Sequence, residues 1–124
     1  MISSAIWITS DSARSFRLTP EDVIETNFKL AGPRHHGSEH GPHHADTQDN
    51  ERLFSEISTK LIKGSDDRFL ILGPGLAKTH FQKYLTSHYP KANIVGVETT
   101  DKLTDGEILD FAHRYFRKFD SLNS

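Results

Sequence analysis

Apolar and polar residues alternate along the first quarter of the chain, which is typical of β-strands that bury one face. The alternation runs through residues 4–10, 14–18 and 23–30. Polar, turn-prone residues separate these three segments, at 10–13 and at 19–22. Because such short connections join neighbouring antiparallel strands, we expect residues 1–31 to form a three-stranded meander.

Helical and buried-strand patterns alternate in residues 47–119. Apolar residues first recur at three- and four-residue spacing, which predicts an amphipathic helix that ends near Gly64. The continuous apolar runs at 69–72 and 94–97 are typical of strands in a parallel sheet. Each run is followed by another amphipathic pattern, and the last of these opens with Thr104 and Glu107 at the spacing of a capping box. The aromatic side chains expected in the core are Trp7, Phe54, Phe69, Phe81, Tyr115 and Phe116.

The resulting order, β-β-β-α-β-α-β-α, predicts an α/β protein of ribonuclease-H-like arrangement. We expect a five-stranded mixed sheet with helices on its faces. At 124 residues the chain fits one domain with one core, 1–124. Within it we expect a meander at 1–31, a histidine-rich loop at 32–46, the α-β-α-β-α half at 47–119, and a tail at 120–124.

The amino-acid composition excludes several kinds of chemical site. The chain has no cysteine, which excludes disulfides, thiolate metal sites and cysteine nucleophiles. A net charge of −2 argues against a general nucleic-acid coat, although eight histidines can add positive charge below about pH 6.5. No apolar window approaches the roughly 20 residues of a membrane span, and the start lacks the basic segment of a signal peptide. We therefore expect a cytoplasmic protein that is not bound to a membrane.

Residues 32–44 gather five of the eight histidines between three glycines and two prolines. Such a segment disfavours regular structure, so we expect an exposed loop. Arg34 and the imidazoles could contact phosphates and unstacked bases of RNA. With Glu39 or Asp46, the histidines could instead bind zinc, nickel or copper, although their spacing matches no fixed metal pattern. A polar loop without defined chemistry is the third interpretation.

A second candidate site follows the first buried strand. Gly73, Gly75 and Lys78 lie where α/β folds expose backbone N–H groups at a helix start, which favours anion binding. Their spacing is not that of a P-loop. The competing interpretation is a tight exit that lets the helix pack on the sheet.

Three segments carry a resemblance to a known family. AIWITSDSAR (5–14), ILGPGLAK (71–78) and IVGVETTD (94–101) resemble small bacterial proteins similar to the middle domain of archaeal and eukaryotic class-1 peptide-chain release factors. The resemblance covers nearly the whole chain. In that family the loop after the third strand carries Gly-Gly-Gln, which assists peptidyl-tRNA hydrolysis. The equivalent residues here, 34–44, contain no glutamine, and the nearest is Gln48.

The resemblance implies a translation-associated binding module that contacts the ribosome or tRNA without peptidyl-tRNA hydrolysis. We expect no cofactor. The contact residues predicted for RNA are Arg34, His35, His36, His40, His43 and His44. The alternative is a metal-dependent hydrolase or nuclease that uses the histidine-rich loop or Asp11, with Glu98 and Asp101 as further carboxylates. The sequence leaves open whether the chain forms a homodimer through an edge strand.

Overall fold

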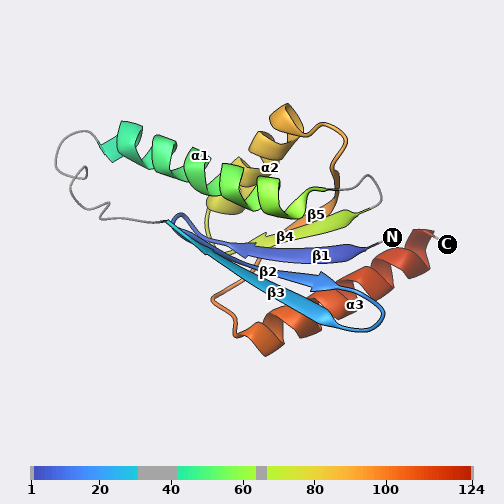
Figure 1. Ribbon diagram of the computed structural model, residues 1–124. Coiled ribbons are helices and arrows are strands. Elements are labelled where there is room, and N and C mark those ends of the chain that lie inside the picture. Colours follow the sequence, from blue (N-terminus) through green and yellow to red (C-terminus); the bar gives the residue numbers. More distant parts are fainter. Residues whose placement is uncertain (1, 31–41, 64–66, 124) are drawn as a thin grey trace.

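The computed structural model describes residues 2–30, 42–63 and 67–123, with the backbone alone at 42–49. The order of elements confirms the predicted β-β-β-α-β-α-β-α succession (Figure 1). The elements are β1 (Ser3–Ile8), β2 (Ser12–Leu18), β3 (Val23–Lys29), α1 (Pro42–Leu61), β4 (Arg68–Gly73), α2 (Ala77–His88), β5 (Asn93–Thr99) and α3 (Asp105–Asn123).

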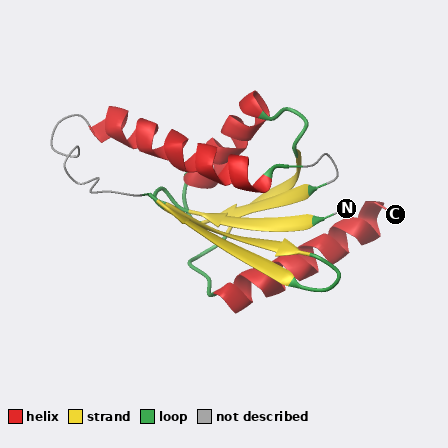
Figure 2. Ribbon diagram, viewed as in Figure 1, coloured by secondary structure: helices red, strands yellow, loops and turns green. Residues whose placement is uncertain are grey.

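The five strands form one mixed sheet in the order β3-β2-β1-β4-β5. β1 pairs antiparallel with β2, and β2 pairs antiparallel with β3. β4 pairs parallel with β1 on one side and with β5 on the other. Helices α1 and α2 lie on one face of the sheet and α3 lies on the other (Figure 2). This is the ribonuclease-H-like arrangement that the element order predicts.

The central strands carry the core because both of their faces are covered. All six residues of β4 are buried, and so are Ala5 to Ile8 of β1. Alternate side chains point to opposite faces. Ile6 and Ile71 pack with α1 and α2, whereas Trp7 and Leu72 pack with α3. The single tryptophan is fixed further by a hydrogen bond of 2.9 Å from its Nε1 to the Thr100 hydroxyl. Of the six aromatic residues expected in the core, Tyr115 alone is only partly buried.

Helix α1 begins at Pro42, earlier than the expected start at residue 47. The prediction of a loop through residue 46 was therefore wrong, and His43 and His44 lie in the first turn of a helix. Proline is well suited to that place, because the first N–H groups of a helix have no internal partner and proline's fixed φ matches the helix. The residues that follow contain no further glycine or proline before α1 ends.

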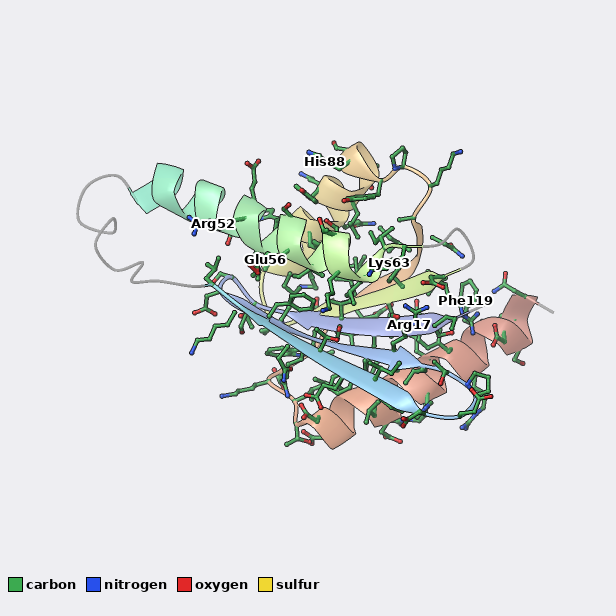
Figure 3. All side chains as sticks on the ribbon, viewed as in Figure 1. Arg17, Arg52, Glu56, Lys63, His88 and Phe119 are labelled. Atoms are coloured by element: carbon green, nitrogen blue, oxygen red, sulfur yellow. The ribbon has the colours of Figure 1, made fainter. Side chains whose placement is uncertain are left out.

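The expected tail at 120–124 was also wrong, because α3 continues to Asn123. Asp120 accepts two hydrogen bonds from the guanidinium of Arg68, of 2.5 and 2.9 Å. This ion pair holds the pKa of the Asp120 carboxyl below its usual range and raises the pKa of Arg68. Arg68 also stacks over the rings of Phe116 and Phe119, the latter labelled in Figure 3. The last turn of α3 is thus tied to the start of β4.

The capping box predicted at the start of α3 is confirmed. The backbone N–H of Glu107 donates to the Thr104 hydroxyl over 3.2 Å, and the N–H of Thr104 donates to the Glu107 carboxylate over 2.8 Å. Among the described residues, no helix is long and apolar enough to cross a membrane.

Candidate functional site at the carboxyl edge of the sheet

The carboxyl ends of β1, β3, β4 and β5 meet at one edge of the sheet, because these four strands run in the same direction. In open α/β sheets this edge is where ligands usually bind. The turn after β1 is held by its own polar groups. The Thr9 hydroxyl donates to the Asp11 carboxylate over 3.0 Å and lies 3.1 Å from the Ser12 hydroxyl. The Leu30 N–H donates to the Asp11 carbonyl over 3.1 Å, which attaches the end of β3 to the same turn.

A pocket of about 320 Å³ opens at this edge. Its walls come from the turn after β1, the turn after β4, the start of α2 and the first half of α1. Its lining residues are Thr9, Ser10, Asn50, Pro74, Gly75, Leu76, Ala77 and His80. Hydroxyl, amide and imidazole groups thus stand beside the exposed side chain of Leu76. The mixture suits a ligand that carries both polar edges and an apolar face.

The Gly73-Pro74-Gly75 turn joins β4 to α2 at this edge of the sheet. A Cβ on Gly73 would overlap the backbone carbonyl oxygen of Ile8, so glycine is required there for β1 and β4 to approach. Gly75 has open space around it. The Lys78 ammonium is buried and donates to the Gly75 carbonyl over 2.5 Å. Gly73 and Lys78, two of the three residues predicted to bind anions, thus also make structural contacts in this turn.

The histidine-rich segment lies in the sequence between β3, which ends at this edge, and α1. Its first neighbour, Leu30, is buried and bonded to the turn after β1. Of the residues predicted to contact RNA, Arg34, His35, His36 and His40 lie outside the described residues. His43 and His44 lie in the first turn of α1.

The carboxylates predicted for a nuclease do not gather into a metal site within the described part of the chain. Asp11 accepts a hydrogen bond from Thr9 in the turn after β1, within the residues 10–13 that were predicted to form a turn. Glu98 is the penultimate residue of β5. Burial of the Tyr115 phenol raises the pKa of that group, and the Glu98 carboxylate raises it further. Asp101 is exposed in the connection to α3.

Sequence reasoning did not assign Thr9, Ser10, Asn50 or His80 to any site. The first two could have been found, because the end of the first strand in an α/β sheet falls at the ligand-binding edge. His80 is exposed on α2. Its place beside Asn50 depends on how α1 and α2 pack together, which no local pattern in the sequence encodes.

The chain matches no protein-family model and no curated protein. Similar folds occur among solved structures. Archaeoglobus fulgidus Pelota covers 91% of this chain with a TM-score of 0.61 at 18% sequence identity. Thermoplasma acidophilum Pelota covers 90% with a TM-score of 0.62 at 20% identity. The archaeal translation termination factor aRF1 covers 96% with a TM-score of 0.57 at 15% identity.

The chain spans only part of each of these proteins: 31% of either Pelota chain and 40% of the termination factor. At such identities the likeness is one of fold. The sheet and the three helices described above therefore have the fold of a portion of Pelota and of archaeal aRF1.

Proposed function

We propose that this protein is a translation-associated binding module that contacts the ribosome or tRNA through its histidine-rich loop. The observation that carries the proposal is the fold shared with the termination factor aRF1 over 96% of this chain. The sequence resemblance to release-factor middle domains also supports a role in translation. The resemblance implies a variable loop between the third strand and the first helix, where this chain has Arg34 and its cluster of histidines.

The described surroundings of the loop support a contact with phosphates and bases. On one side the loop follows Leu30, which is anchored in the core, and on the other it precedes α1, which packs on the sheet through Leu53 and Ile57. Contact residues on a loop gain precision when both ends are fixed to a rigid scaffold. The proposed contacts are Arg34, His35, His36, His40, His43 and His44. Peptidyl-tRNA hydrolysis is not part of the proposal, because the loop has no glutamine.

The turn at Gly73 and Gly75 offers a second contact for phosphate at the same edge. Leu76, at the N-cap of α2, gives no side-chain hydrogen bond to the first turn, so backbone N–H groups there are not capped by it. Backbone N–H groups at a helix start attract anions. Lys78 would add positive charge beneath the turn and not a direct contact, because its ammonium is bonded to Gly75.

The test is co-sedimentation of the purified protein with ribosomes, and a pull-down of tRNA, at graded salt. Contacts to phosphates weaken steeply as salt rises. A variant with Arg34, His35, His36, His40, His43 and His44 replaced by alanine should lose binding at salt concentrations where the native protein is retained. The control replaces His113, Arg117 and Lys118, which are exposed on α3, by alanine.

The control variant should bind as the native protein does, and both variants should keep the native melting temperature. Binding that survives the loop substitution would overturn the proposed contact residues. Absence of binding to ribosomes and tRNA at low salt would overturn the function. The alternative, a metal-dependent hydrolase, predicts stoichiometric metal in the purified protein, which elemental analysis measures. No contact among the described residues favours this alternative.

A further inference from the structure

Strand β3 forms one outer edge of the sheet, and no described element lies along its outer side (Figure 1). It pairs with β2 without interruption from Ser12 opposite Lys29 to Leu18 opposite Val23. The strand contains no proline and its pairing has no bulge, two devices that commonly protect sheet edges from other strands. It also exposes β-branched apolar side chains, 37% at Val23 and 51% at Ile24. The edge is therefore regular and open to a further strand.

Two opposite charges stand on one face of this strand. Glu25, Asn27 and Lys29 alternate with Ile24, Thr26 and Phe28, so the first three share the face on which α3 packs against the neighbouring strands. Glu25 and Lys29 are both exposed, and neither forms an ion pair with any residue that the structure describes. They cannot pair with each other, because four residues along a strand span about 13 Å.

We propose that the β3 edge binds β3 of a second copy of this chain, in an antiparallel register centred on Asn27. In that register Glu25 lies opposite Lys29 of the second copy, and two-fold symmetry makes the same pair twice. Directly opposed residues in antiparallel strands have Cβ atoms about 5 Å apart, close enough for an ion pair. The charge pattern of the strand is thus complementary to itself.

The same register accounts for the exposed apolar side chain. Ile24 lies opposite Leu30 of the second copy, and Thr26 lies opposite Phe28. A two-fold axis perpendicular to the sheet keeps each face continuous, so α1 and α2 of both copies stand on one side. The surface that Ile24 exposes in the monomer would then continue into the apolar face formed by Phe28 and Leu30, which are both buried against the core.

The opposite edge of the sheet does not offer this complementarity. β5 carries one charged residue, Glu98, and its pairing with β4 is interrupted between Phe69 and Leu70. The side chain of Tyr115 from α3 also donates a hydrogen bond to the Val95 carbonyl of that strand. The proposal therefore assigns the interface to β3. It is independent of the proposed contact with ribosomes or tRNA.

Charge reversal tests both the surface and the register. The native protein, E25K, K29E and the double variant E25K/K29E would be compared by analytical ultracentrifugation from about 5 to 500 μM at low salt. Each single reversal places like charges opposite each other twice, so the dimer dissociation constant should rise about tenfold or more. The double variant exchanges the charges and should restore the native constant. Both residues are exposed, and circular dichroism checks that all four proteins are folded.

A native protein that stays monomeric across this range would overturn the proposal. So would a dimer that tolerates both single reversals, because it would use another surface, or single reversals that the double variant does not rescue, because the register would be wrong. A mass that rises only when an extended peptide from another protein is added would assign the edge to a different occupant and would equally overturn it.

Discussion

Replacing Gly73 by alanine is expected to destabilise the fold, because the added methyl group points at another strand. Its Cβ would overlap the carbonyl oxygen of Ile8 and lie 3.4 Å from the Ile8 carbonyl carbon. The obstacle is backbone in the centre of the sheet, which cannot rotate away as a side chain can. β1 and β4 would have to separate where both are buried.

Overpacking of this kind typically costs about 1–3 kcal/mol. The reduced freedom of alanine in the unfolded chain returns about 0.4–1 kcal/mol, so we expect a net loss of about 1–2 kcal/mol. Against a total stability of about 5–15 kcal/mol this is a large share. If the free energy of unfolding falls by about 2 kcal/mol per molar urea, the unfolding midpoint should fall by roughly 0.5–1 M.

Fluorescence of Trp7 suits the measurement, since this single tryptophan is buried and hydrogen-bonded to Thr100. Gly75→Ala is the matched control in the same turn. Nothing lies within 4 Å of a Cβ at Gly75, and its backbone is not in the left-handed region. The free energy of unfolding of this control should therefore stay within about 0.5 kcal/mol of the native value. Equal midpoints for the two variants would refute the assignment of Gly73 to close strand packing.

Two further predictions concern α3. The carboxyl of Asp120 has a lowered pKa because it accepts hydrogen bonds from Arg68, so its stabilising effect is present above about pH 4 and is lost as the pH falls through the folded-state value. The urea midpoint of Asp120→Asn should therefore lie below that of the native protein at pH 7, and the two midpoints should converge at about pH 2–3. A difference that persists at low pH would contradict the assignment of this effect to the Asp120 carboxylate. Thr104→Ala removes the hydroxyl that caps the Glu107 N–H and should lower the free energy of unfolding by about 1 kcal/mol. The control, Thr59→Ala on the exposed side of α1, should lower it much less. Equal losses of stability in thermal unfolding would exclude the cap.

The sequence predicted the elements whose side chains repeat with a clear period. The apolar run at 69–72 is short and continuous because β4 has helices on both faces, whereas a strand with one solvated face would alternate. The start of α1 was missed because Pro42 is compatible both with a loop and with a first helical turn. The end of α3 was missed for a different reason. Asp120 is polar, so it does not extend the apolar pattern of the helix. Its partner Arg68 is 52 residues away in the sequence, so no local pattern indicates their ion pair.

The candidate site was predicted less completely than the fold. The glycines of the turn after β4 gave a clear local signal, but it fits both an anion site and a tight exit from the strand. The structure adds two contacts that the sequence does not indicate, that of Gly73 with Ile8 and the hydrogen bond of Lys78 to Gly75. The first depends on strand pairing and the second on a side-chain conformation, so neither can be read from spacing. Asn50 and His80 line the same pocket because α1 and α2 pack together.

The position of β1 has a consequence for how the chain folds. β1 is near the start of the sequence, yet it is the middle strand of the sheet, and its contact with β4 joins Ser3 to Arg68 across 65 residues. The hairpin of β1 with β2 can form early because its loop is short, whereas the parallel pair must wait until β4 has been synthesised and a long loop has closed. During synthesis the apolar faces of β1 therefore stay uncovered until more than half of the chain has left the ribosome.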